Sequence, residues 1–178
     1  MGRAILLLGA LLLVACGEAW SPRAEPGVAQ PSPDAQTFKA ASESARDFTG
    51  DLTIAPDRLA FAKGARLMTR TLAPRSADEL AARGGDSFAA IALSSGDLRV
   101  EVRAVAAMGL QQGAPSLCPG DLAPSYAALV YGRRDMRVTI IFFTGPDAPS
   151  QEAQKSRVCG VYAFAAPAGA RTRQGVVL

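Results

Sequence analysis

From about residue 49 onward, the apolar side chains of the chain recur at every second position, and this period predicts half-buried β-strands. Leu52 and Ile54 share one strand face, and Leu59 and Phe61 share a face of the next run after a tight turn. The stretch ARLMTRTLAP at 65–74 continues the alternation. These runs therefore predict three short strands with tight connections.

The most regular alternation runs from residue 98 to residue 103. Leucine and valine occupy its even positions, and charged side chains occupy the odd ones, Arg99, Glu101 and Arg103. The apolar run SFAAIALS precedes this stretch across a Ser95-Gly96 turn, which predicts an antiparallel hairpin. We expect the charged row to face solvent, because one face of an antiparallel sheet is commonly solvated.

Three more strands are predicted in the C-terminal part of the chain. The runs SYAALVYG and MRVTIIFFTG are joined by GRRD at 132–135, and Val138 to Phe143 in the second run is apolar on both faces except for Thr139. A strand of that kind is expected at the centre of a sheet. CGVYAFAA at 159–166 predicts the last strand, after a polar loop.

Helical signals are sparse. Ser76 and Glu79 have the spacing of a capping box, and Gly84 is a suitable stop, which predicts a helix of about two turns. Residues 34–48 predict a marginal helix. With up to eight short strands, the chain is expected to be mainly β, with a single antiparallel domain at 37–178 that forms a small curled barrel or two packed layers.

The N-terminus has a different character. Residues 1–15 contain one positive charge, at Arg3, and no acidic residue. A twelve-residue apolar run follows Arg3. This is the anatomy of a secretory signal peptide. The run is too short to cross a membrane as a helix, since crossing takes about 20 apolar residues.

Leu13, Val14, Ala15 and Cys16 resemble the lipobox of bacterial lipoproteins, in which a branched apolar residue and two smaller residues precede an invariant cysteine. The resemblance implies that the signal is removed before Cys16 and that the Cys16 sulfur receives a diacylglycerol. Several acyl chains would make this anchor nearly permanent. Gly17, rather than aspartate, follows the cysteine, which by the same resemblance implies an outer-membrane protein facing the periplasm. The alternative is an ordinary secretory signal.

Residues 16–36 are expected to join this anchor to the folded domain. Four prolines and almost no large apolar side chains beyond Trp20 follow the cysteine. Such a composition buries too little surface to offset the entropy of ordering, so it predicts a flexible tether.

The chain has three cysteines, an odd number. If Cys16 carries lipid, Cys118 and Cys159 remain as a pair, and in an oxidising periplasm a disulfide between them is expected. Two buried free thiols are the alternative.

Candidate chemistry is limited by what the composition lacks. The sequence contains no histidine, which excludes catalytic sites of the Ser-His-Asp and Cys-His types and zinc sites built from cysteine and histidine. AARGGDS at 81–87 lacks the lysine and spacing of a phosphate-binding loop. The sequence therefore predicts no metal site, no cofactor and no recognisable catalytic residue.

Net charge adds little, since +3 spread over 178 residues indicates no nucleic-acid partner. We expect a non-enzymatic envelope protein, held in the membrane by its lipid, that binds a partner protein, the cell wall or a small ligand. One alternative is a carboxylate-dependent hydrolase of the cell envelope, with Glu101, Asp97 and Asp135 as candidates. The other is a β-barrel that carries a lipid or another apolar ligand.

Overall fold

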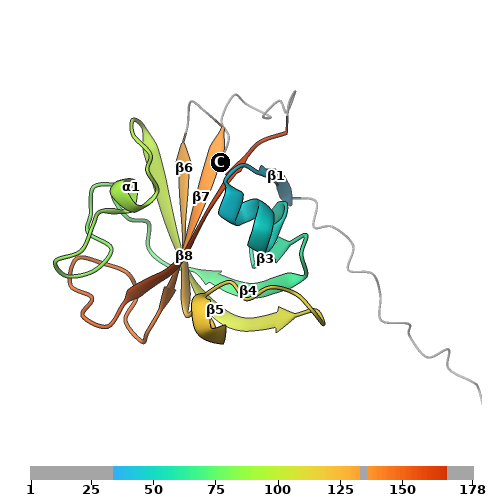
Figure 1. Cartoon of the computed structure of the whole chain (residues 1–178). Coiled ribbons are helices and arrows are strands. Elements are labelled where there is room, and N and C mark those ends of the chain that lie inside the picture. Colours follow the sequence, from blue (N-terminus) through green and yellow to red (C-terminus); the bar gives the residue numbers. More distant parts are fainter. Residues whose placement is uncertain (1–33, 133–135, 168–178) are drawn as a thin grey trace, which may run out of the picture. The chain divides into compact units, whose positions relative to one another are not determined.

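Within residues 34–132 and 136–167, which the computed structural model describes, eight antiparallel strands close into a barrel (Figure 1). Each strand pairs with its neighbours in sequence, and β8 pairs back with β1. The strands are β1 (Gln36–Ala40), β2 (Leu52–Ala55), β3 (Arg58–Phe61), β4 (Ala65–Thr71), β5 (Leu98–Leu110), β6 (Tyr126–Gly132), β7 (Arg137–Thr144) and β8 (Arg157–Ala165). The expectation of a mainly β, single antiparallel domain is confirmed, and the barrel is the form it takes.

Short helical segments occupy three of the connections in the described part of the chain: η1 (Ala45–Thr49), α1 (Phe88–Ile91) and η2 (Pro119–Asp121). No helix among the described residues is long and apolar enough to cross a membrane. The predicted signal peptide, the lipid attachment at Cys16 and the tether up to residue 33 lie outside the described residues.

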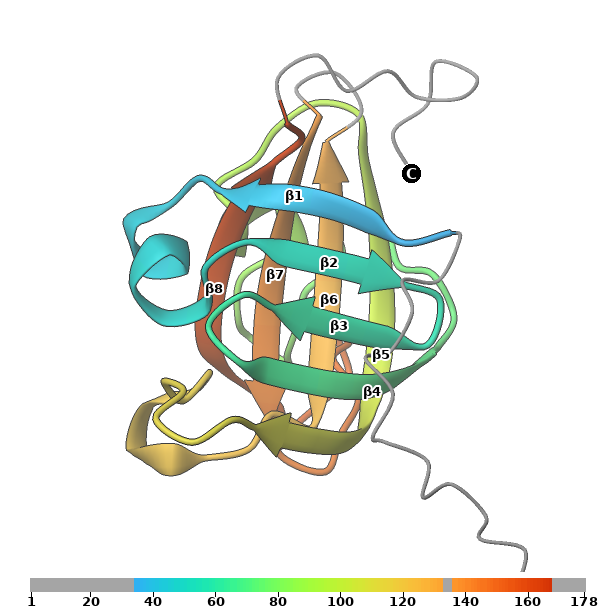
Figure 2. The same ribbon diagram turned by 90° about the vertical axis from the view of Figure 1, so that its right-hand side faces the viewer.

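The barrel is flattened into two layers that cross each other. In Figure 2, β1 to β4 run across the front, while β6 to β8 run upright behind them. The long strand β5 belongs to both layers, because its first half pairs with β6 and its second half pairs with β4. The register of β4 and β5 shifts between Met68 and Thr69, and such a bulge lets a strand bend from one layer to the other.

Aromatic and branched side chains fill the inside of the barrel. The Phe142 ring meets Phe61 and Tyr162 edge-on, with centroids 6.0 and 5.9 Å apart, and Phe61 also lies 6.3 Å from Phe164. These rings come from β3, β7 and β8, on both layers. Alternate residues of these strands point inward, as the period of two predicted.

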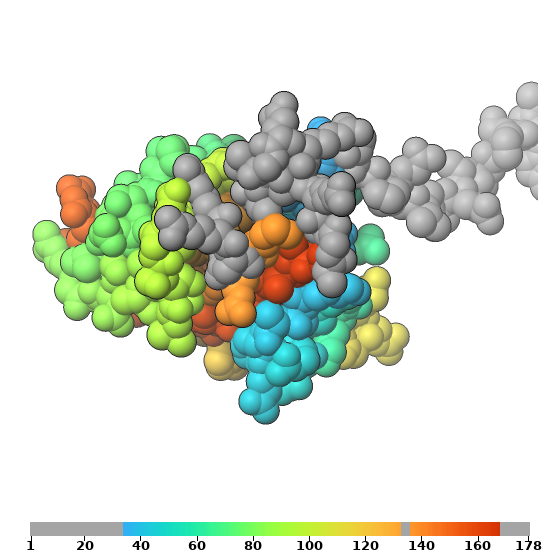
Figure 3. Space-filling view, turned by 90° about the horizontal axis from the view of Figure 1, so that it is seen from above, coloured from blue at the N-terminus to red at the C-terminus, as the bar shows by residue number. Residues whose placement is uncertain are grey.

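A second apolar cluster lies outside the barrel. The excursion between β4 and β5, residues 72–97, folds over the outer face of β5, β6 and β7, and Phe88 of α1 packs against Phe143 of β7 at 6.3 Å. In Figure 3 this green excursion forms the left flank of the molecule, whereas the blue and cyan N-terminal segments lie on the right. The excursion gives the outer face of β5–β7 an apolar cover.

The expected number of strands is right for the described chain, but two of the assignments behind it are wrong. Residues 88–91, expected in a strand, form α1, and the Ser87 side chain caps this helix by accepting a hydrogen bond from the Ala90 amide at 3.2 Å. Residues 36–40, expected in a helix, form β1 and close the barrel against β8. The helical part of that prediction is reduced to the single turn η1, downstream of the strand.

The capping-box prediction is also wrong. The amide of Glu79 donates to the main-chain oxygen of Ser76 at 3.2 Å, which makes a turn, and the Glu79 carboxylate pairs with Arg75 at 3.3 Å. Because these partners replace the reciprocal side-chain bonds of a capping box, no helix starts here.

The two ends of the barrel differ. At the tether end, β1 begins at Gln36 and β8 finishes at Ala165. At the opposite, distal end, η1 and the 111–125 loop pack onto the interior core, with Ala45 and Leu117 fully buried. The start of β1 and the finish of β8 therefore lie at the end of the barrel away from these segments.

Candidate functional site

The charged row of β5 lies on the inward face of the strand, contrary to expectation, and only Arg99 at its start remains exposed to solvent. Arg99, Glu101 and Arg103 stand opposite Tyr131, Leu129 and Ala127 of β6, respectively. Residues opposed in an antiparallel pair share a face, and those β6 residues belong to the interior core. The charged side chains therefore point into the tether end of the barrel, while Val100 and Val102 face outward, beneath the 72–97 excursion.

Glu101 and Arg103 form a largely buried ion pair on β5. Arg103 is 4% exposed, and its Nε donates to a carboxylate oxygen of Glu101 at 2.7 Å. Its Nη1 reaches the main-chain oxygen of Ala55 on β2 at 2.7 Å. The Thr71 hydroxyl donates to the same Glu101 oxygen at 3.0 Å. The Arg103 guanidinium thus joins β5 to β2, and the Glu101 carboxylate that balances its charge also accepts a hydrogen bond from β4.

Arg99, at the start of β5, makes a cation–π contact with Tyr131 of β6. The Arg99 guanidinium lies over the Tyr131 ring, 5.9 Å from its centroid, and contacts Glu101 at 3.8 Å. Burial raises the pKa of the Tyr131 phenol to about 12, and the negative charge of Glu101 adds to that rise, against the opposing effect of Arg103 and Arg99.

This pKa makes the stability of the barrel sensitive to alkaline pH. Because the folded state holds the Tyr131 proton more tightly than the unfolded chain does, its contribution is fully present below pH 10 and is lost as the pH rises toward 12. The loss should reach about 3 kcal/mol for a shift of this size. Urea unfolding of the Tyr131→Phe variant should show a shallower fall in stability from pH 10 to 12 than wild type; parallel curves would contradict the assignment.

The carboxylates considered for a hydrolase have different surroundings. Glu101 is engaged by two guanidinium groups and a hydroxyl. Asp97 lies in the turn before β5, and Asp135 lies outside the described residues. Among the residues that the structure describes, no cluster of three or more cysteine, aspartate or glutamate side chains could hold a metal ion.

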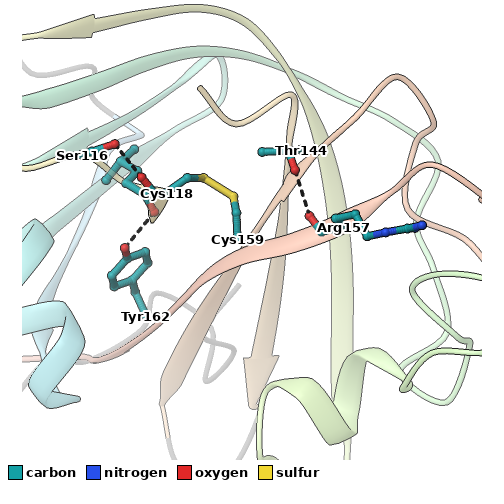
Figure 4. The surroundings of a disulfide bond; sticks show 7 residues. Ser116, Cys118, Thr144, Arg157, Cys159 and Tyr162 are labelled. Carbon is teal, nitrogen blue, oxygen red and sulfur yellow. Dashed lines mark hydrogen bonds between the residues drawn. A yellow bond between two sulfur atoms is a disulfide. The ribbon is translucent and has the colours of Figure 1, made fainter. Parts of the chain in front are cut away.

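Cys118 and Cys159 lie together at the distal end, as the cysteine count predicted. Their sulfur atoms are 2.05 Å apart, at disulfide distance, and join the 111–125 loop to the start of β8 (Figure 4). The Tyr162 hydroxyl donates to the main-chain oxygen of Leu117 at 2.8 Å, next to the bridge. A Cβ at Gly160 would come within 2.6 Å of that same oxygen, so a glycine is needed for the loop to approach β8 this closely.

A surface cavity of about 550 Å³ lies beside the same end of β8, on the outer side of the barrel. Its walls come from three separate parts of the chain: residues 81–86 with Ile91 of α1, Phe143 at the end of β7, and residues 154–158. The two loops are held together by the Arg83 amide, which donates to the main-chain oxygen of Ala153 at 2.9 Å. Figure 1 shows these green and orange loops side by side at the lower left.

The cavity combines an apolar floor with a charged rim. Ile91 and Val158 supply apolar surface over the buried Phe143, and Arg83, Asp86 and Arg157 supply charge. Its volume lies within the range of small-molecule binding sites. Sequence reasoning missed it, because each wall reads by itself as a polar loop or as a core strand.

Compared with known proteins, this chain matches no family model, no curated protein and no solved structure.

Proposed function

We propose that this chain is a lipid-anchored lipoprotein of the bacterial envelope whose barrel domain binds a ligand or partner and catalyses no reaction. The observation that carries the proposal is the place of the cavity, which lies by the distal end of β8. The tether enters at Gln36, at the other end of the barrel. A domain held on a flexible tether from that end would leave the cavity open to the periplasm.

The two alternatives have less support. A lipid-carrying barrel needs space inside, and here the rings of Phe61, Phe142 and Phe164 meet across the interior. A carboxylate hydrolase needs a carboxyl group available to the substrate. Glu101, the described candidate on β5, is instead held by Arg103 at 2.7 Å within the barrel. The cavity outside the barrel is the better place for binding.

Labelling with an alkyne analogue of palmitate tests the anchor. We expect wild-type chain to be labelled and recovered with the outer-membrane fraction, whereas the Cys16→Ser chain should be unlabelled and released. Export of the variant, followed by disulfide formation, serves as the control for correct folding. Unlabelled, soluble wild-type chain would overturn the lipoprotein assignment.

The binding role is tested on the lipidated chain in solubilised envelope. Crosslinking from a photoreactive residue placed at Gln154, on the rim of the cavity, should capture a ligand or partner. The matched control is the same residue at Arg70, an exposed position on β4 away from the cavity. Equal capture from the two positions would contradict binding at this end of the barrel.

A further inference from the structure

The cavity rim holds the guanidinium groups of Arg83 and Arg157, and both have hydrogen-bond donors without a partner among the described residues. The Nη1 of Arg157 donates to the main-chain oxygens of Gln154 and Ser156 at 2.8 and 2.9 Å, which fixes the position of its guanidinium. Its Nε and Nη2 have no partner among the described residues, and neither has any side-chain nitrogen of Arg83. A guanidinium fixed in this way offers a planar pair of donors that matches a carboxylate.

A buried hydroxyl in the cavity wall also lacks a partner. Ser156 is 1% exposed, and within the described chain its Oγ makes no hydrogen bond. A buried polar atom without a partner costs about 1–3 kcal/mol, so each such atom in a folded protein calls for an explanation. Because Ser156 lines the cavity next to Arg157, a polar group bound in the cavity would give this hydroxyl a hydrogen-bond partner.

The charges and the floor narrow the class of ligand. Two guanidinium groups against the single carboxylate of Asp86 leave one net positive charge on the rim, which a ligand with one carboxylate would neutralise. The apolar surface of Ile91 and Val158, backed by the buried Phe143, favours an apolar body of a few carbon atoms. A ligand with both parts would satisfy the rim and cover the floor at once.

We propose that this cavity binds a small ligand in which one carboxylate is joined to an apolar body, with Arg83, Arg157 and Ser156 as the groups that receive the carboxylate. The inference rests on the proposed binding function and narrows it to a chemical class. Two sources share this chemistry, namely short fatty acids and the apolar C-terminal residue of a peptide.

Titration calorimetry on the full chain carrying Cys16→Ser tests the class and separates the sources. The probes are octanoate and N-acetyl-phenylalanine, each compared with its neutral amide. We expect at least one acid to bind about tenfold or more tightly than its amide, since the carboxylate gains charge-assisted hydrogen bonds. The acid that shows this preference identifies the source. No binding, or equal affinity for acid and amide, overturns the inference.

Variants on the rim assign the binding to this cavity. Arg83→Gln should lower the affinity for the acid about five- to tenfold and leave the affinity for the amide unchanged, because the Arg83 side chain bonds to no other described group. Asp86→Asn should raise the affinity for the acid, because it removes the negative charge that repels the ligand's carboxylate. Arg70→Gln, on the outer face of β4, is the matched control and should change neither. Acid binding that Arg83→Gln and Asp86→Asn leave unaltered would place the site elsewhere and overturn the inference.

Ser156→Ala separates a binding role from a structural one. The hydroxyl has no partner in the described protein, so its removal should leave the urea midpoint equal or higher while the acid binds more weakly. A lower midpoint with unchanged affinity would contradict its role as a ligand donor. These outcomes are independent of the anchor, since palmitate labelling at Cys16 and crosslinking from the rim report on the proposed function separately.

Discussion

Replacing Arg103 by methionine should lower the free energy of unfolding by about 3 to 5 kcal/mol, the cost of breaking a buried ion pair from one side. The substitution would leave the Glu101 carboxylate buried without its 2.7 Å partner, and the main-chain oxygen of Ala55 without its donor. Methionine has a similar length and no charge, so packing is largely kept. Guanidinium chloride unfolding, followed by the circular dichroism of the barrel, measures the loss.

Arg99→Met is the matched control for this prediction. The Arg99 side chain is 45% exposed and lies 3.8 Å from the same carboxylate, so its loss should cost less than about 1 kcal/mol. In the double variant Arg103→Met with Glu101→Gln, much of the stability should return, because the uncompensated charge is gone. If Arg103→Met costs no more than Arg99→Met, the pair is not a support of the barrel.

Removing the bridge between Cys118 and Cys159 should lower stability by about 3 to 4 kcal/mol. The bridge closes a loop across a separation of 41 residues, and without it the unfolded chain gains the corresponding freedom. The Cys118→Ala, Cys159→Ala double variant should therefore unfold at a lower denaturant concentration than wild type. The loss should concentrate at the distal end, where the bridge holds the 111–125 loop against β8.

Reductant provides the control for the bridge. Dithiothreitol should lower the unfolding midpoint of the wild-type chain toward that of the double variant, and should leave the double variant unchanged. Intact mass after alkylation counts the free thiols in each sample. A wild-type midpoint that ignores reductant, with both thiols shown to be free, would mean that the cysteines do not stabilise the fold by crosslinking it.

Strands with a clear period of two were predictable from local sequence. In β2 and β3 the large apolar residues recur at the spacing of one strand face, whereas β6 and β7 are short continuous apolar runs of the kind expected at the centre of a sheet. β1 was missed because QTFKA has one large apolar residue, Phe38, and its strand form depends on pairing with β2 and β8. The α1 helix was misread because a short apolar run such as FAAIAL fits either structure.

The candidate site was less predictable than the fold. The pairing of Cys118 with Cys159 followed from counting cysteines, since two remain once Cys16 is assigned to lipid. The cavity could not be found in that way, because its walls lie about 60 residues apart in the chain and meet only when the 72–97 excursion folds over β7. The loop at 81–86 carries an arginine, but by itself it does not indicate a binding site, because the other wall is formed by the loop at 154–158.

β5 shows where the two kinds of information divide. Its sequence determined that one face is apolar and the other charged, because side chains alternate along any strand. Only the tertiary structure decided that the charged face points into the barrel, where Arg103 meets Glu101 and Ala55, and that the valines point outward. The reason is that the 72–97 excursion supplies an apolar cover for the outer face, so residues 100–103 are covered on both faces of the strand. Alternation alone cannot say which cover each face receives.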